Sequence, residues 1–222
     1  MKLETFTFES LKMIPYQAGP IDNNTYLLAD TETKTCVVID PSYGFEEALE
    51  TIQQEGWQIQ AFWLTHAHYD HTIHAFYAGQ VTPSIPIALH PDDLPIWEAG
   101  GTARLDQKEK EPSYPKPSIA LADGMSLQTG RYSLTVLHTP GHSPGGCCFY
   151  LQEAGWLFSG DTVFYESFGR TDLYGGSMEV ELRSIQNKVL TLPDETIIFP
   201  GHNDFTTVQR ERHFYAANFG LH

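Results

Sequence analysis

Three histidines and one aspartate lie within six residues of this chain, in the stretch that runs from Thr65 to His71. Neutral imidazole nitrogen and carboxylate oxygen are both common ligands of divalent zinc. On an extended segment the side chains of His66 and His68 project to the same side, because they are two residues apart. Asp70 and His71 then point elsewhere. The spacing therefore predicts a second metal site beside the first.

The same kind of residue recurs at the ends of three later apolar runs. His142, Asp161 and His202 each stand next to a glycine, just after a segment that is expected to form a strand. Glycine lets the backbone approach other groups closely. One such residue alone is more often part of a capped turn. Four strand ends of this kind in one chain predict a single shared site.

Asp40 follows the β-branched run 35–39 and precedes Pro41. An aspartate in this place is often a simple turn residue. It could also lie behind a metal ligand and orient it. Both interpretations stay open on the residues alone.

The elements that must position these residues follow from the apolar periodicity. Alternation of apolar and polar residues predicts antiparallel strands near 3–9, 12–17, 24–29 and 35–39. The run 59–64 predicts the strand that leads into the first cluster, and 72–79 predicts the helix after it. Further strands are expected at 85–89, 125–129, 132–138, 145–151, 156–159 and 196–199, and further helices at 45–55, 91–99, 179–190 and 206–217. Strands followed by helices, twice over, predict two sheets packed face to face with helices outside.

Composition favours one domain that spans residues 1–222. Hydrophobic residues make up 41% of the chain, and we find no low-complexity tract or fixed-period repeat. Residues 100–117 are polar and include a charged run at 108–111, so they are expected to form a solvated loop.

Charge and cysteine content limit the partners and the compartment. The formal net charge of −15 opposes binding to nucleic acid and to anionic membranes. Cys36, Cys147 and Cys148 are odd in number and two are adjacent, which favours a reducing compartment. The N-terminal residues lack the apolar core of a signal peptide, and no apolar stretch approaches the ~20 residues that span a bilayer. These features predict a cytoplasmic protein, and they leave its oligomeric state open.

The ordered motifs resemble those of the metallo-β-lactamase-fold superfamily, over most of the chain. Within it, the runs 160–164 and 168–173 resemble the glyoxalase II (hydroxyacylglutathione hydrolase) branch. The ending 199–202 with 206–212 is similar to the single-domain bacterial members of that branch. The resemblance implies an α/β fold of four layers, an αββα sandwich, with the metal site at one edge of the two sheets.

The resemblance also implies a ligand set for two divalent ions, most often zinc, with iron or manganese as alternatives. The first metal is expected on His66, His68 and His142, the second on Asp70, His71 and His202, with Asp161 bridging both and Asp40 orienting a ligand from behind. This arrangement leaves room for a hydroxide that bridges the two metals.

Hydrolysis of a thioester of the S-lactoylglutathione type is the activity that the resemblance implies. The bridging hydroxide would attack the thioester carbonyl, and Asp70 would orient it as the catalytic residue. Arg170 stands where that family has a lysine and is the candidate to bind a substrate carboxylate; the alternative is a surface ion pair with Asp172. Only 20 residues follow His202, too few for the helical domain that grips glutathione, and Asn203-Asp204 replace an acidic residue and a tyrosine.

Three alternatives share these residues. A mononuclear iron dioxygenase that acts on glutathione persulfide would bind its iron through His66, His142 and Asp161. A phosphodiesterase or nuclease of the same fold is disfavoured by the acidic charge. A metal-binding protein without enzymatic activity is disfavoured because the ligand set leaves coordination positions open.

Overall fold

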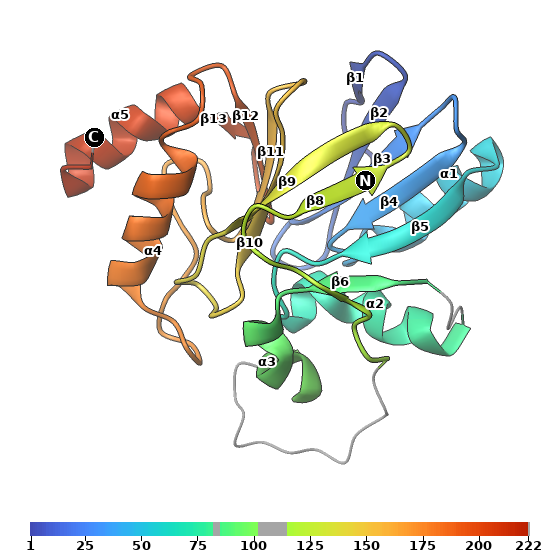
Figure 1. The fold of residues 1–222 in the computed structure, drawn as a ribbon, viewed down its shortest axis with the longest axis horizontal. Helices are drawn as coiled ribbons and strands as arrows, with labels where there is room; N and C mark the ends of the chain where they lie inside the picture. Colours follow the sequence, from blue (N-terminus) through green and yellow to red (C-terminus); the bar gives the residue numbers. More distant parts are fainter. Residues whose placement is uncertain (82–84, 102–114, 222) are drawn as a thin grey trace.

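Two β-sheets packed face to face form the centre of the molecule (Figure 1). The computed structural model describes residues 1–81, 85–101 and 115–221. The first sheet contains, in spatial order, β1 (Phe6–Phe8), β2 (Leu11–Ala18), β3 (Asn23–Asp30), β4 (Thr35–Ile39), β5 (Gln58–Trp63), β6 (Ile87–Leu89) and β7 (Ile119–Ala120). The second contains β13 (Thr206–Thr207), β12 (Ile197–Pro200), β11 (Trp156–Gly160), β10 (Cys147–Leu151), β9 (Tyr132–His138) and β8 (Ser126–Thr129).

Helices cover the outer face of each sheet (Figure 1). Outside the first sheet lie α1 (Phe45–Glu55), α2 (Tyr69–Val81) and α3 (Leu94–Glu98), the last preceded by a 3₁₀ turn (Pro91–Asp93). Outside the second lie α4 (Met178–Ser184), which continues as a π-helical turn (Ile185–Val189), and α5 (Val208–Phe219).

Three apolar clusters fill the spaces between these layers. The cluster between the sheets includes Trp63 from β5 and Phe149 from β10. A second cluster joins the first sheet to α1 and α3, and a third joins the second sheet to α4 and α5. The predicted αββα sandwich is therefore confirmed.

Helix α1 shows how local sequence sets these layers. Phe45, Ala48 and Ile52 recur at helical spacing and are the buried residues of the helix. Gly56 ends the helix in the left-handed conformation, with φ at 69°, which glycine adopts without steric cost. The predicted bounds 45–55 are confirmed.

Other bounds differ from the prediction. Helix α2 begins at Tyr69 rather than at residue 72, because its first turn is polar and gives no apolar periodicity. The expected helix 91–99 is divided into the 3₁₀ turn and α3, and the expected helix 179–190 ends in a π-helical turn. Strands β7 and β13 were not predicted, since two residues carry no alternation. The loop expected at 100–117 lies largely outside the described residues.

The strand directions bring several strand ends to one edge. β4 and β5 are parallel, and so are β11 and β12. β9 and β11 are both antiparallel to β10, so β9 runs in the same direction as β11 and β12. The backbone N–H of Cys147 donates to the carbonyl oxygen of Thr65 at 2.8 Å, which joins the two sheets at this edge.

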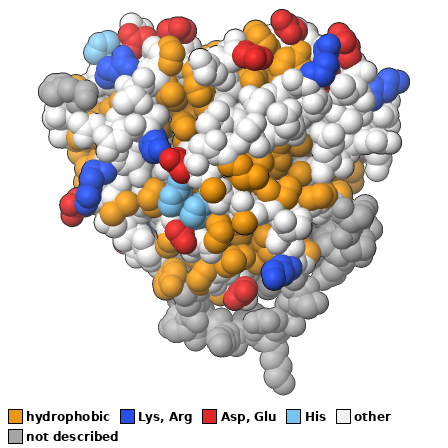
Figure 2. All heavy atoms as spheres, viewed as in Figure 1, with side chains coloured by type: hydrophobic (Ala, Val, Ile, Leu, Met, Phe, Trp, Pro, Cys, Tyr) orange, Lys and Arg blue, Asp and Glu red, His pale blue; other side chains and the backbone are white. Residues whose placement is uncertain are grey.

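The cysteines, the helix lengths and the surface charge bear on the expected compartment and partners. The three cysteines are buried and free. Within the described ranges, the helices are all too short or too polar to cross a membrane. On the face that Figure 2 shows, basic side chains are scattered and several lie beside acidic ones.

Candidate metal centre

The ligands predicted for a first metal lie together at this edge. His66 and His68 lie on the segment after β5, and His142 lies on the loop after β9. All three are buried. The Nδ1 atom of His68 is 2.9 Å from Nε2 of His142, and Nε2 of His66 is 3.3 Å from that same atom. Three imidazole nitrogens therefore converge on one point.

The ligands predicted for a second metal lie beside them. Asp70 and His71 occupy the first turn of α2, and His202 follows β12. The two Nε2 atoms of His71 and His202 are 3.1 Å apart. Oδ2 of Asp70 is 3.4 Å from Nε2 of His71 and 3.3 Å from Nε2 of His202.

Asp161, at the end of β11, lies between the two groups. Its Oδ2 is 3.4 Å from Nε2 of His142 in the first group and 3.5 Å from Nε2 of His202 in the second. Its Oδ1 is 3.2 Å from Nε2 of His71. One carboxylate thus reaches both groups, as the predicted bridging role requires.

These distances fit two metal ions. Zinc–nitrogen bonds of about 2.0–2.1 Å in a tetrahedron put neighbouring ligand atoms about 3.3–3.4 Å apart. The pairs above range from 2.9 to 3.5 Å. Oδ1 of Asp161 is also buried without a hydrogen-bond partner among the described residues, which is costly unless a cation satisfies it.

The outer nitrogens of the histidines fix which nitrogen faces the centre. Nδ1 of His142 donates to the carbonyl oxygen of Arg170 at 2.7 Å, and Nδ1 of His202 donates to that of Ile21 at 2.9 Å. Nδ1 of His71 donates to Oδ2 of Asp40 at 3.0 Å. In each case the lone pair of Nε2 is left for a metal.

The two groups differ in protonation. Burial, with His71 nearby, holds the pKa of His66 well below its ordinary value, and burial together with His142 lowers the pKa of His68 to about 3. Burial alone would lower the pKa of His202, but its hydrogen bonds to Asp161 and Asp70 outweigh this and raise that pKa to about 9. His66 and His68 therefore offer neutral imidazoles, whereas His202 carries a proton that a metal must displace.

Asp40 lies directly behind the predicted ligands, in the place that the resemblance implies for an orienting aspartate. Its Oδ1 accepts from the backbone N–H of Thr65 at 2.8 Å, and its Oδ2 accepts from the hydroxyl of Thr65 at 2.6 Å and from His71. Its φ of 48° is unusual for a residue other than glycine. Backbone strain of this kind tends to occur at functional sites.

Comparison with known proteins agrees with this geometry. The sequence profile of the metallo-β-lactamase superfamily matches residues 18–202. The chain belongs to the metallo-β-lactamase superfamily. The probable metallo-hydrolase YqgX of Bacillus subtilis is 36% identical over 198 residues, which cover 87% of this chain and 91% of that protein. This superfamily member is accordingly a metallo-hydrolase.

Two further relatives are informative. The hydroxyacylglutathione hydrolase GloC of Haemophilus influenzae is 29% identical over 209 residues, with 91% of this chain and 95% of that protein covered. The crystal structure of TTHA1623 in a di-iron-bound form superposes on this chain with a TM-score of 0.75, and the two sequences are 38% identical. The match covers 89% of this chain and 96% of that chain.

Several residues around the metallo-hydrolase centre were missed from the sequence. Asn23 donates through Nδ2 to Oδ2 of Asp70 at 3.0 Å, and Oε2 of Glu181 accepts from the backbone N–H of His142 at 2.6 Å. Asp93 contacts two ligand loops. The pair Asn23-Asn24 was a usable signal, because two amides in an otherwise apolar strand need buried partners. Glu181 and Asp93 had no such signal.

A cavity of about 500 Å³ opens onto the centre. Beside the ligands, the described residues that line it include the apolar and aromatic side chains of Ile21, Tyr69, Phe164 and Leu173 and the guanidinium of Arg170. The exposed guanidinium of Arg170 forms a paired contact with Asp172, in which Nε and Nη2 lie 2.7 Å from the two carboxylate oxygens. The substrate-binding role of Arg170 stays a prediction.

Another group of possible ligands, away from this centre, is less suited to a metal. It consists of His90, Asp92 and His138. The two imidazole rings are stacked, with centroids 3.9 Å apart and planes 9° from parallel. A metal lies in the plane of each imidazole that binds it, and two stacked rings share no such plane. These side chains would have to rotate before they could chelate.

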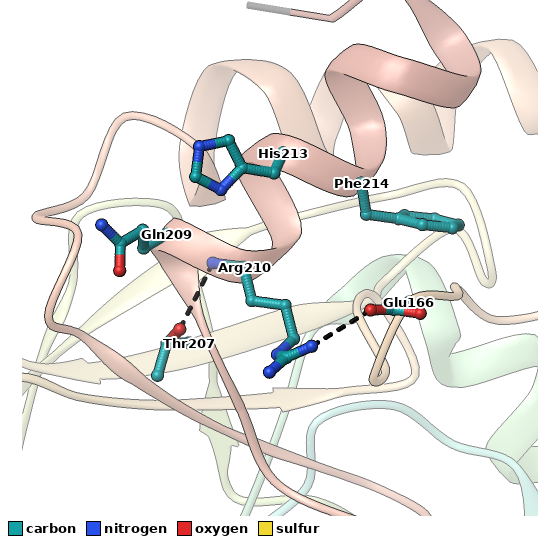
Figure 3. A pocket seen from close by; sticks show the side chains of 6 residues that line it. All are labelled: Glu166, Thr207, Gln209, Arg210, His213 and Phe214. Atoms are coloured by element: carbon teal, nitrogen blue, oxygen red, sulfur yellow. Dashed lines mark hydrogen bonds and ion pairs between the residues drawn. The ribbon is translucent and has the colours of Figure 1, made fainter.

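A further hollow lies along α5 (Figure 3). It is lined by Glu166, Thr207, Gln209, Arg210, His213 and Phe214, and has a volume of about 520 Å³. Its cation, Arg210, points toward Glu166, with Nη1 3.2 Å from Oε1. None of the predicted ligands lines it, so the cavity at the metal centre is the better candidate for substrate.

Proposed function

We propose that this metallo-hydrolase cleaves thioesters of the S-lactoylglutathione type. The observation that carries the proposal is the pair of ligand groups joined by Asp161 at the floor of a cavity that is open to solvent. Two divalent ions, most often zinc, would be held by the seven residues named above, and would lower the pKa of a bound water and polarise the carbonyl oxygen.

Asp70 is the residue that we assign to orient the attacking water. Its side chain is 28% exposed, more than those of Asp161 or His202 beside it. Burial alone would raise the pKa of Asp70, but interaction with His71 and the hydrogen bond from His202 bring it below its ordinary value. The ionised carboxylate can accept a hydrogen bond from water, and Asn23 holds it in place.

The leaving group supports a thioester over an amide. A thiol has a pKa of only ~8.5, so a thiolate leaves with little protonation. An amine needs a proton donor that is placed beside the scissile bond. The cavity combines an ionised carboxylate with apolar and aromatic walls, which suits an attack on a carbonyl whose leaving group needs no such donor.

GloC supports glutathione as the thiol carrier. That protein bears the name hydroxyacylglutathione hydrolase, and 95% of its length aligns with this chain. Arg170 would then bind a glutathione carboxylate after exchange of its partner Asp172.

A second candidate is a dioxygenase with one iron. His66, His142 and Asp161 do lie together, with 3.3 Å and 3.4 Å between the nearest atoms. This candidate leaves the convergence of Asp70, His71 and His202 without a purpose, so we favour the hydrolase.

Steady-state kinetics test the proposal. The protein loaded with zinc is expected to hydrolyse S-lactoylglutathione, and Asp70→Asn should lower kcat by about 100-fold or more. Asp204→Asn is the matched control, because Asp204 is an exposed carboxylate close to His202 in sequence and is expected to leave kcat unchanged. Absence of thioester hydrolysis, with oxygen uptake on glutathione persulfide instead, would contradict the proposal.

A further inference from the structure

We infer that Asp93 is a positioning residue that ties together the two loops carrying the ligands of the first metal. The inference rests on the proposed metal centre, but its test does not use thioester hydrolysis. Asp93 ends the 3₁₀ turn before α3, and its side chain is fully buried at 0% exposure. A buried carboxylate persists only where several donors satisfy it.

Three donors from two loops meet this carboxylate. Oδ2 of Asp93 accepts from the backbone N–H of Ala67 and from the hydroxyl of Ser143, both at 2.9 Å. Oδ1 accepts from the backbone N–H of Gly145 at 2.6 Å. Ala67 lies between His66 and His68, and Ser143 follows His142 directly. One side chain therefore fixes the distance between the first sheet's ligand loop and the second sheet's.

The second loop is shaped to reach Asp93. A Cβ atom added at Gly145 would lie 2.8 Å from Cβ, Cγ and the backbone nitrogen of Asp93, which is closer than real Cβ atoms come to other groups. Only glycine lets the backbone N–H at this position approach the carboxylate so closely. Both the carboxylate of Asp93 and the glycine at position 145 are therefore needed for this contact.

Different residues hold the ligands of the second metal. Asp70 is held by Asn23, His71 by Asp40, and His202 by the carbonyl oxygen of Ile21. Within the described part of the chain, the side-chain hydrogen bonds of Asp93 all come from the two first-metal loops. Loss of this contact should therefore weaken the first site and leave the second unchanged.

Replacement by asparagine isolates this effect. The three donors require acceptors on both oxygens of residue 93. In Asp93→Asn one position carries an NH₂ group, which must face the N–H of either Gly145 or Ala67. At least one tie between the loops is lost without a change of size. Residues behind metal ligands typically contribute about 10–100-fold in metal affinity.

Titration with zinc alone measures each site in a single-site variant. In His202→Ala, which is expected to keep only the first site, Asp93→Asn should raise the Kd for zinc by about 10–100-fold. In His68→Ala, which is expected to keep only the second site, the same change should leave the Kd unaltered. Competition with a chromophoric chelator gives both constants without any measurement of activity.

Asp30→Asn is the matched control. Asp30 is also fully buried and accepts from Ser10 Oγ at 2.8 Å and from the backbone N–H groups of Glu32 at 3.0 Å and Arg131 at 3.1 Å; unlike Asp93, it also accepts from the guanidinium Nε of Arg131 at 3.2 Å. It ends β3, whose other end, at Asn23, lies beside Asp70, so about 23 Å of strand separates it from the centre. Both Asp30→Asn and Asp93→Asn are expected to lower the melting temperature, because each removes a buried acceptor, but Asp30→Asn should not change the affinity for zinc.

Two results would overturn the inference. One is an unchanged first-site Kd in Asp93→Asn; the other is an equal rise in Asp30→Asn, which would make the effect one of general stability. If Asp93→Asn does not fold, Ser143→Ala replaces it, since it removes only one of the three donors. A smaller rise in the first-site Kd is then expected, and no rise would overturn the inference. Failure of the protein to hydrolyse thioesters would leave these constants measurable.

Discussion

The two metal sites should respond differently to pH. The pKa of His202 is raised to about 9, because its hydrogen bonds to Asp161 and Asp70 outweigh burial. A pH of 7 lies about two units below this pKa. The metal must displace the proton of His202, and this should weaken metal binding at pH 7 by about 100-fold, or about 2.7 kcal/mol. Each rise of one pH unit toward 9 should strengthen binding about tenfold. His71, whose pKa is also raised against burial by Asp161 and Asp70, should steepen this slope.

His66 and His68 in the first site should contribute no such slope. Burial and neighbouring histidines lower the pKa of His68 to about 3 and hold that of His66 well below its ordinary value. Both are already neutral near pH 7 and have no proton to release. Their zinc affinity should therefore stay nearly constant across the range in which the second site gains about 100-fold.

Zinc titrations of the two single-site variants separate these outcomes. His68→Ala reports on the second site and His202→Ala on the first, each measured from about pH 6.5 to about pH 8.5, where a histidine with a raised pKa changes charge. Calorimetry in buffers of different ionisation enthalpy would count the protons released. Equal slopes for the two variants, or proton release from the first site alone, would refute the reasoning.

Three further predictions concern single residues. Asp161→Ala should remove both metals and lower activity more than Asp40→Asn, for which about 10–100-fold is typical; elemental analysis that finds both metals retained would contradict the bridge. Burial raises the pKa of Glu181 from 4.5 to about 9, so the folded state favours its neutral form. As the pH rises between those two values, the protein should lose up to about 1.4 kcal/mol of stability per pH unit. Glu181→Gln should remove this loss in metal-free protein. If the melting temperatures of the variant and of the unaltered protein fall in parallel as the pH rises, the prediction is wrong. Arg170→Ala should raise KM for a glutathione thioester more than for a small uncharged one; equal changes would make Arg170 structural.

Much of the fold could be predicted because its signals are local. The bounds of α1 follow from apolar residues at helical spacing and from Gly56, which can adopt the left-handed conformation. The start of α2 could not be predicted in this way. Its first turn holds Asp70 and His71, and residues selected for chemistry there interrupt the apolar pattern.

The candidate site divides in the same way. The convergence of the seven predicted ligands could be anticipated, because their motifs follow strands and the parallel strand directions bring these strand ends to one edge. Asp93 and Glu181 could not be found, because both act only through hydrogen bonds to residues that are far away in the sequence. Their positions in the sequence are ordinary ones for an aspartate in a turn and a glutamate in a helix.

The metal content of the protein as it is produced in the cell tests the central claim most directly. The two groups of ligands joined by Asp161 predict close to two divalent ions per chain, and His202→Ala should retain close to one. Elemental analysis of both proteins, purified in parallel, measures these values. A single iron per chain, or the same metal content in His202→Ala as in the unaltered protein, would contradict the account.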